Sequence, residues 1–136
     1  MRKDDCIFCK IANGEIPGAC LYEDDNFKVV LDVGPASKGH CLVLPKEHYE
    51  NIYEMPEELL GKAIGVAKKI GTKLVKVIGA DGLNILQNNG LAAGQTVFHF
   101  HIHLIPRFDG ENEMISWIPG TLDEKLKEEL VKEFAN

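Results

Sequence analysis

The chain has 136 residues, of which 45% are hydrophobic and 26% are charged, a balance typical of one soluble globular domain with a core of its own. Its formal net charge of −6 argues against nonspecific nucleic-acid binding, which depends on a dense basic surface. Because no apolar run approaches ~18 residues and the N-terminal residues show no signal-peptide pattern, we expect no membrane partner and a cytoplasmic location.

The first part of the chain predicts a short helix over residues 6–13, followed by three strands. Short apolar runs bounded by turn-forming residues indicate strands at 19–22, 27–33 and 40–44, and the third is expected to end before Pro45. The first and third strands each contain a cysteine, which we expect to be packed as an apolar residue.

One long helix is predicted to begin at Pro56, which suits the first helical position and is followed by two glutamates. An apolar stripe repeats at helical spacing from Leu60 to Val77, and lysines concentrate near the C-terminal end. Gly79 can cap the helix. The pattern indicates a helix that packs one face against a core.

Two further strands are predicted over 82–87 and 97–105, joined by a glycine-bearing loop at 88–95, and residues 123–134 predict a terminal helix. Strands linked mostly by short turns, with a single long helix, favour an α+β fold built on a five-stranded antiparallel sheet. We expect short N- and C-terminal helices and one domain over residues 1–136.

Three histidines alternate with apolar residues at positions 99, 101 and 103. On a strand this spacing would place all three imidazoles on one face and the apolar residues on the other. Strand residues four apart are separated by roughly 13 Å, whereas a Zn–N bond is about 2.1 Å, so three such rings cannot easily share one ion. At most one or two of them would serve a metal, and the others are free for different chemistry.

Imidazole can act as a nucleophile, an acid or a base near neutral pH. A histidine that attacks phosphorus forms a phosphoramidate that water later cleaves, and the reaction needs donors for the phosphate oxygens. The loop before the histidines has glycines that let backbone amides approach an anion, and Gln95 and Thr96 add side-chain donors. The sequence therefore predicts a phosphate site beside the histidines.

Cys6 and Cys9 form a Cys-x-x-Cys pair. In a chain without an export signal, such a pair indicates metal binding or redox chemistry. A structural zinc ion would need two more ligands, for which His40, His48 and one of the alternating histidines are candidates. Two unligated thiols in a short helix are the alternative, and a thioredoxin-like role fits less well because the βαβ context is missing.

Several segments resemble the histidine triad family of nucleotide hydrolases and transferases, in the branch close to the nucleoside phosphoramidases. The signature is His-x-His-x-His followed by two apolar residues, at 99–105. Other segments match in the same order, at 7–11, 31–35, 39–48 and 94–97, so that with the signature the matching segments are spread from one end of residues 6–106 to the other. A tryptophan–proline segment at 117–120 is similar to one near the end of that branch.

The resemblance implies a separate role for each histidine of the site. His101 would be the nucleophile, His103 would contact the phosphate or leaving group, and His40 would support the site from a neighbouring strand. The implied substrate-binding residues surround the base, the ribose and the phosphates: Ile7, Phe8 and Leu31 (base), Asp32 (ribose), and Asn88, Gly94, Gln95 and Thr96 (phosphates).

The same resemblance implies a structural zinc ion and no catalytic metal. Its ligands would be Cys6, Cys9, His48 and His99. The chain departs from the family pattern at Thr96, where close relatives often carry serine. The resemblance also implies a homodimer in which two five-stranded sheets join into one of ten, and in some relatives a C-terminal segment reaches the partner's site, which makes Trp117 of interest.

Taken together, these residues predict an enzyme that attacks the α-phosphate of a purine nucleoside phosphoramidate of the AMP–amine type. A nucleotidyl-histidine intermediate would form and then be hydrolysed. Three alternatives stay open: a dinucleoside polyphosphate hydrolase using the same site, a nucleotide-binding interaction module with little turnover, and a metallohydrolase that uses the histidines for catalytic zinc.

Overall fold

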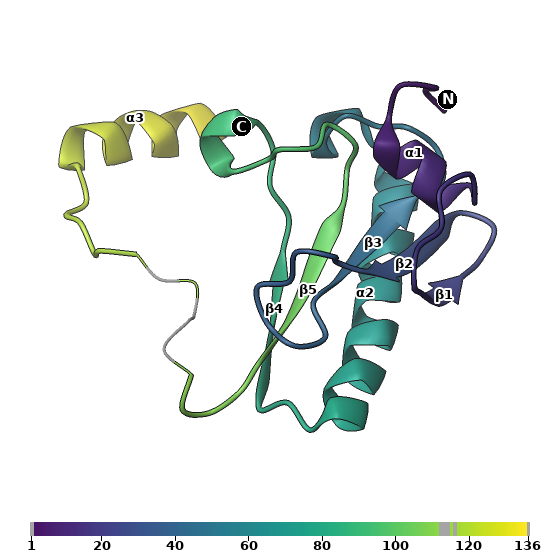
Figure 1. Cartoon of the computed structure of the whole chain (residues 1–136). Coiled ribbons are helices and arrows are strands. Elements are labelled where there is room, and N and C mark those ends of the chain that lie inside the picture. Colours follow the sequence, from purple (N-terminus) through teal and green to yellow (C-terminus); the bar gives the residue numbers. More distant parts are fainter. Residues whose placement is uncertain (1, 112–114, 116, 136) are drawn as a thin grey trace.

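The five predicted strands form one antiparallel sheet in the order β1-β2-β3-β5-β4 (Figure 1). The computed structural model describes residues 2–111, 115 and 117–135. The strands are β1 (Cys20–Glu23), β2 (Phe27–Leu31), β3 (Cys41–Pro45), β4 (Gly82–Leu86) and β5 (Ile102–Arg107). The helices are α1 (Ile7–Ala12), η1 (Ile52–Glu54), α2 (Glu57–Ile78), η2 (Leu91–Ala93) and α3 (Glu124–Phe134). Among the described residues, no helix is long and apolar enough to cross a membrane.

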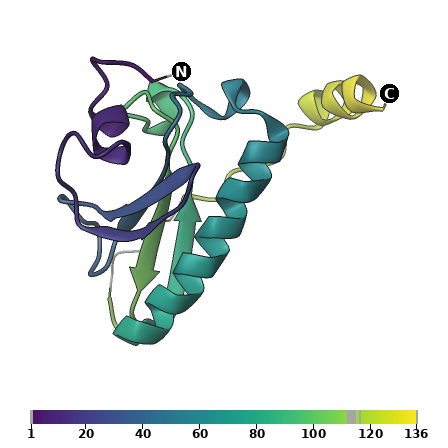
Figure 2. The ribbon, with the colours of Figure 1, turned by 90° about the vertical axis from the view of Figure 1, so that its right-hand side faces the viewer.

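Each face of the sheet packs against its own helix, α2 on one side and α1 on the other (Figure 2). Because side chains alternate along a strand, neighbouring residues of β2 and β3 enter different cores. Val29 and Val43 pack with α2, whereas Val30 and Leu42 pack with α1. The predicted α+β sheet with one long helix is therefore confirmed, and it has two small cores.

The long helix forms as its apolar stripe predicts. The residues that it buries toward the sheet are Ala63, Val66, Ala67, Ile70 and Gly71. Gly79 ends the helix in the left-handed conformation at φ 68°, and its N–H donates to the carbonyl oxygen of Val75. The predicted cap is confirmed, whereas the helix begins at Glu57, one residue later than predicted, with Pro56 as its N-cap.

The fifth strand is shifted relative to the prediction of 97–105, because it begins only at Ile102 and continues to Arg107. The segment before it leaves the sheet: the N–H of Phe100 donates to the carbonyl oxygen of Tyr49 instead of to a strand. Pro106 does not end β5, because at that position the strand pairs with β4 alone and the carbonyl oxygen of Pro106 accepts a hydrogen bond from the Ser37 hydroxyl.

The two remaining cysteines differ in burial. Cys41 on β3 is fully buried, as expected. The same expectation is wrong for Cys20, which is exposed on the edge strand β1, where the pairing register shifts between Cys20 and Tyr22. Its thiol donates to the carbonyl oxygen of Tyr22.

The predicted terminal helix forms as α3, which extends away from the sheet (Figure 2). Asp123 caps its start by accepting a hydrogen bond from the N–H of Leu126. No residue of α3 is buried within the chain, and Trp117, which precedes the helix, is 80% exposed. The apolar side chains of α3 are therefore about half or more exposed.

The loop between β2 and β3 turns at Gly39, directly before His40. Gly39 has a φ of +89°, and a Cβ added there would lie 2.7 Å from Cδ1 of Ile78 and 3.3 Å from Cγ of Pro106. Only glycine combines this backbone conformation with this close approach. Gly39 therefore lets the loop lie against α2 and β5 and sets where β3 begins.

We expect Gly39→Ala to lower the free energy of unfolding by more than Gly79→Ala does. Both substitutions strain a positive φ, at a cost of about 1 kcal/mol, but a Cβ at Gly79 meets nothing within 4 Å, so only Gly39→Ala adds a clash. Urea unfolding of the two variants measures the difference. Equal losses would show that the loop has room to move away.

Candidate functional site

Four potential metal ligands from three separate segments meet beside α1. Cys6 and Cys9 come from the start of α1, His48 follows β3, and His99 precedes β5. Nδ1 of His99 lies 3.4 Å from both sulfur atoms, and Nδ1 of His48 lies 3.3 Å from Sγ of Cys9. All four ligand atoms lie within 4.8 Å of one another. The structure thus selects His48, and not His40, as the companion of the cysteines.

The donor set fits a tetrahedral zinc ion. With Zn–S bonds near 2.3 Å and Zn–N bonds near 2.0–2.1 Å, sulfur and nitrogen ligands lie about 3.5 Å apart. Nε2 of His99 lies 2.8 Å from the carbonyl oxygen of Pro45, so it carries the proton and leaves the Nδ1 lone pair toward the thiols. Burial lowers the pKa of His99 to about 4, which keeps the ring neutral, as a metal ligand must be.

Burial also raises the pKa of the Cys9 thiol. A bound divalent cation would reverse this preference, because a coordinating thiol is deprotonated. Without a cation, burial therefore favours the neutral thiol, and binding of a cation would release its proton.

His40, directly before β3, and His103 on the adjacent strand β5 form a second, hydrogen-bonded pair. The N–H of Ala36 donates to Nδ1 of His40 at 2.9 Å, so the proton of this ring is on Nε2. Nε2 of His40 in turn donates to Nδ1 of His103 at 2.9 Å, with a carboxylate oxygen of Asp32 at 3.5 Å. It follows that His103 carries its own proton on Nε2.

Asp32, His40 and His103 also lie close enough together to hold an ion. Both nitrogens of His40 are already used, however, one as an acceptor from a backbone amide and one as a donor to His103. Burial lowers the pKa of His40, and it lowers that of His103 to about 4, so both rings are neutral near pH 7. The arrangement suits a chain of hydrogen bonds better than a metal site.

His101 lies between the two groups and has a single fixed tautomer. Its Nδ1 is 2.7 Å from the carbonyl oxygen of His99, which can only accept, so Nδ1 carries the proton and Nε2 keeps a lone pair. The ring of Phe8 meets that of His101 edge-on at 5.0 Å, and the ring of His103 is 4.9 Å away. Burial lowers the pKa of His101 despite its hydrogen bond to the carbonyl. This is the state that a nucleophilic imidazole requires.

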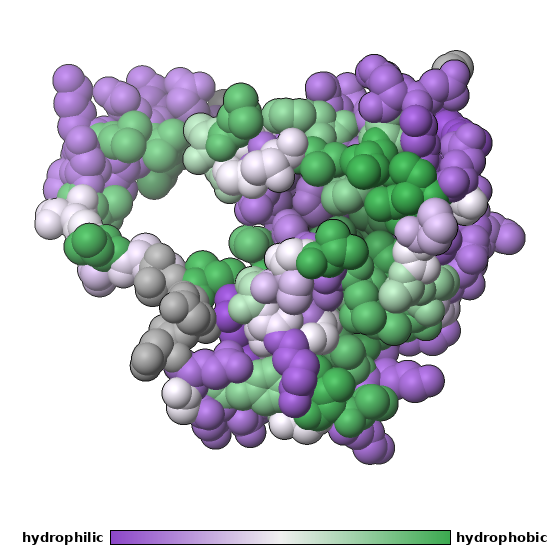
Figure 3. Space-filling view, viewed as in Figure 1, coloured by the Kyte–Doolittle hydropathy of each residue, from purple (hydrophilic) through white to green (hydrophobic). Residues whose placement is uncertain are grey.

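A cavity of about 240 Å³ opens at His101 and His103 on the α1 face of the sheet. Figure 3 shows hydrophobic side chains gathered around α1 and the neighbouring strands on this side of the molecule. The apolar lining comes from α1, β2, β3 and nearby loops: Phe8, Ile11, Val30, Leu31, Val33, Leu42 and Val97. The other lining residues are Asp32, Thr96, His101 and His103. The cavity thus combines a mostly apolar lining with four polar residues, one of which is the His101 imidazole.

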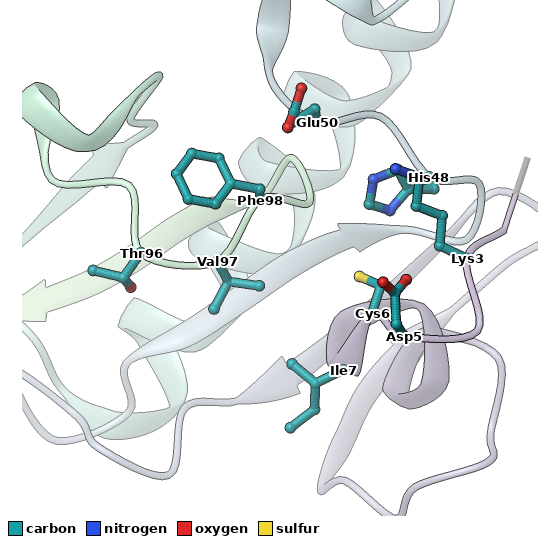
Figure 4. Close-up of a pocket in the computed structure, with 9 residues that line it drawn as sticks. All are labelled: Lys3, Asp5, Cys6, Ile7, His48, Glu50, Thr96, Val97 and Phe98. Atoms are coloured by element: carbon teal, nitrogen blue, oxygen red, sulfur yellow. The ribbon is translucent and has the colours of Figure 1, made fainter.

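The structure brings part of the predicted substrate-binding set to this cavity. Phe8, Leu31, Asp32 and Thr96 line it, together with the two histidines, whereas Asn88, Gly94 and Gln95 do not. Ile7 lines a neighbouring cavity instead (Figure 4).

Gln95 is almost completely buried. Its amide group donates to the carbonyl oxygens of Glu50 and Val97 at 2.7 and 3.1 Å and accepts from the N–H of Gly90 at 2.8 Å. Both of its amide hydrogens are therefore occupied in holding the loop, which positions Thr96 at the cavity.

Sequence reasoning missed two backbone groups of the site, the N–H of Ala36 and the carbonyl oxygen of His99. Each decides the tautomer of a histidine. Every residue carries such groups, so no residue type could have indicated them. Among side chains it missed Val97, which directly follows the predicted phosphate loop and lines the cavity.

The HIT domain model matches residues 13–110 of the chain. An uncharacterized HIT-like protein of Methanocaldococcus jannaschii is 48% identical over 126 residues, which are 90% of this chain and 97% of that protein. The adenosine 5'-monophosphoramidase of Candida albicans is 40% identical over 141 residues, 93% of this chain and 92% of that protein. The adenylylsulfatase of Arabidopsis thaliana is 47% identical over 105 residues, 77% of this chain and 53% of that protein.

Solved structures show the same fold. A protein from Streptococcus mutans superposes with a TM-score of 0.90 and 41% identity, over 98% of this chain and 85% of that chain. A Zn-bound histidine triad family protein from Mycobacterium smegmatis has a TM-score of 0.78 and 36% identity, over 95% of this chain and 91% of that chain. With this sheet, this arrangement of histidines and these matches, the chain belongs to the HIT domain family.

Proposed function

We propose that the protein is a nucleotide hydrolase that cleaves the bond between the α-phosphate of an AMP-like nucleotide and an amine. The observation that carries the proposal is the state of His101, which lines a cavity and whose Nδ1 proton is held by a carbonyl oxygen, so that Nε2 keeps its lone pair. Relatives named adenosine 5'-monophosphoramidase support the class of substrate.

The cavity suits a nucleoside monophosphate in one orientation. The purine would lie against Phe8 and Leu31 of the apolar lining, and the carboxylate of Asp32 would accept hydrogen bonds from the ribose hydroxyls. The phosphate would lie at Thr96, where the hydroxyl and backbone amides can donate to its oxygens. This orientation brings phosphorus to His101.

The proposed reaction has two steps. Nε2 of His101 attacks phosphorus, a P–N bond to the imidazole forms, and the bond to the amine nitrogen breaks with its electron pair leaving on that nitrogen. The leaving nitrogen accepts a hydrogen bond from Nε2–H of His103, takes a proton from a water molecule and departs as the neutral amine. The hydroxide formed from that water attacks phosphorus, and the P–N bond to the imidazole breaks, which releases AMP and returns the electron pair to Nε2 of His101. His40 acts as a positioning residue, because its hydrogen bond keeps the His103 proton on Nε2.

We expect His101→Gly to lose hydrolysis of an AMP–amine phosphoramidate while binding AMP within about threefold of the original affinity, because only the nucleophile is removed. Rapid acid-free quenching should trap a nucleotidylated protein with the original chain and with Cys20→Ser, but not with His101→Gly. Free imidazole should partly restore turnover of His101→Gly.

Full activity of His101→Gly without imidazole would exclude this mechanism. Tight AMP binding by the original chain, with no turnover of any phosphoramidate, would instead favour a nucleotide-binding module.

We also propose that Cys6, Cys9, His48 and His99 hold a structural zinc ion. The geometry of the four ligand atoms and the neutral, oriented His99 ring support it, as does the Zn-bound relative. When bound, zinc would tie α1 to the segment after β3 and to the segment before β5, and it would take no part in the reaction. Phe8, two residues after Cys6 on α1, would then be held against His101.

Metal analysis of the purified protein should give one zinc ion per chain. Cys9→Ser should lower this stoichiometry severalfold, because a three-ligand site binds zinc more weakly, whereas Cys20→Ser, at an exposed thiol far from the cluster, should leave it unchanged. Thermal unfolding with and without a chelator completes the test. An unchanged unfolding temperature after complete zinc removal would contradict a structural role.

A homodimer is proposed at the free edge of the sheet, where β4 pairs on one side only. Beside it lies an apolar groove of about 420 Å³, lined by Ile52, Leu60, Gly61, Ile64, Gln87, Phe100 and Ile102. A second copy fits this groove because a two-fold axis at β4 would continue the sheet and bring the two α2 helices together. Gly61 and Gly65 of α2 leave open space there, with nothing within 4 Å of an added Cβ.

Sedimentation equilibrium of the full chain should give a dimer at micromolar concentration. Ile64→Glu should shift the equilibrium toward monomer, since it places a charge in the groove, whereas Val77→Glu, exposed at the far end of the same helix, should not. A dimer unaffected by Ile64→Glu would place the interface elsewhere.

A further inference from the structure

One thiol of the cysteine cluster lies at the wall of the neighbouring cavity, which has a volume of about 370 Å³. Cys6 and His48 line this cavity together with side chains that are exposed to solvent, among them those of Lys3 and Phe98. Figure 4 shows Cys6 and His48 on one side of the cavity and Phe98 on the other. A small polar solute can therefore reach Cys6 while the protein stays folded.

The other thiol of the pair is shielded. Cys9 is 0% exposed, against 9% for Cys6, and it does not line the cavity. The two sulfur atoms lie within 4.8 Å of each other, and each is 3.4 Å from Nδ1 of His99. The Cys-x-x-Cys spacing is also the one at which disulfide oxidoreductases form their disulfide. The pair thus consists of an accessible thiol with a buried thiol beside it, as in cysteines that sense oxidants.

We propose that Cys6 is a peroxide-reactive thiol, and that its oxidation to a disulfide with Cys9 releases the ion held by the cluster. The inference rests on the proposed zinc site. A coordinated thiol is deprotonated, and the thiolate is the form that attacks peroxide. The N–H of Cys9 donates to the Cys6 sulfur at 3.4 Å, which further stabilises negative charge on that atom.

The oxidation has two steps, with hydrogen peroxide as the oxidant. The Cys6 sulfur attacks one peroxide oxygen, the O–O bond breaks, hydroxide leaves, and Cys6 becomes a sulfenic acid. The Cys9 sulfur then attacks the Cys6 sulfur, an S–S bond forms, and a second hydroxide leaves. Two protons from solvent convert both hydroxides to water, and the two sulfur atoms have given two electrons to the peroxide. Only His48 and His99 remain as ligands of the cluster, so the ion dissociates.

Release of the ion would loosen two contacts of His101. Phe8, between the two cysteines on α1, meets the His101 ring edge-on at 5.0 Å. The carbonyl oxygen of His99 holds the Nδ1 proton of the same ring. Both neighbours are tied to the cluster, Phe8 through α1 and His99 through its own side chain. Oxidation should therefore lower the turnover of an AMP–amine phosphoramidate, and reduction with zinc should restore it.

The zinc-loaded full chain with Cys20→Ser tests the inference, because this substitution removes the exposed thiol outside the cluster. Hydrogen peroxide should release one zinc ion per chain to a chromophoric chelator. The intact mass should then be about 2 Da below that of the reduced, zinc-free chain. After denaturation only Cys41 should react with a thiol reagent, because burial raises its pKa to about 12 and keeps it protonated during the oxidation. Dithiothreitol with added zinc should reverse every change.

The order of reaction identifies the accessible thiol. With a limiting amount of iodoacetamide, peptide mapping of the zinc-loaded chain should find Cys6 alkylated before Cys9. Cys9→Ser removes the partner thiol, so peroxide should leave a sulfenic acid on Cys6 that dimedone traps. The matched variant Cys6→Ser should give far less trapping at Cys9, because that thiol is buried.

The outcomes separate this inference from the other proposals. Zinc and both thiols retained in peroxide, or alkylation of Cys9 before Cys6, would overturn it. Unchanged turnover after complete oxidation and zinc release would overturn the coupling to His101. A chain that binds no zinc would overturn the zinc site and this inference with it, and would leave the proposed hydrolysis intact. A zinc-loaded chain that hydrolyses no phosphoramidate would overturn the proposed function, while zinc release and thiol mapping still decide this inference.

Discussion

The hydrogen bond from Nδ1 of His101 to the carbonyl oxygen of His99 is the interaction on which the rest of the site depends. It fixes which nitrogen of the buried imidazole has the lone pair. The side chain of His99 is fixed as well. Its Nε2 donates to the carbonyl oxygen of Pro45, and its Nδ1 faces the thiols of Cys6 and Cys9. One residue thus links the end of β3, the cysteine cluster and the reactive ring. A displacement of His99 would change all three.

Main-chain groups set the protonation pattern on the other side of the cavity too. The N–H of Ala36 orients His40, which orients His103, and the loop that carries Ala36 can approach because Gly39 has no side chain. On the same side, Gln95 fixes the position of the loop that carries Thr96 through three hydrogen bonds. The proposed reaction uses the imidazoles of His101 and His103, whereas His40 and Gln95 hold their surroundings in place.

The sequence patterns indicated the strands, the long helix and the Cys6–Cys9 pair, because each depends on residue type and spacing. The choice of His48 and His99 as the residues that meet this pair came from the family resemblance, and the structure brings all four together. The alternating histidines were expected to share one strand. Only His103 lies within β5, whereas His99 and His101 precede it, in a segment that bonds to Tyr49 and contacts the cysteines. Gln95 resembled a phosphate ligand because its amide is polar, whereas the fold buries it. Tautomers and burial depend on tertiary contacts, which local patterns do not contain.

The tautomers themselves can be measured. A long-range proton–nitrogen correlation spectrum of the zinc-loaded protein near pH 7 reports which nitrogen of each imidazole is protonated. The structure predicts a proton on Nδ1 of His101 and on Nε2 of His40 and His103, with all three rings neutral. A His101 ring protonated on Nε2 would leave no lone pair for attack on phosphorus and would contradict the proposed mechanism.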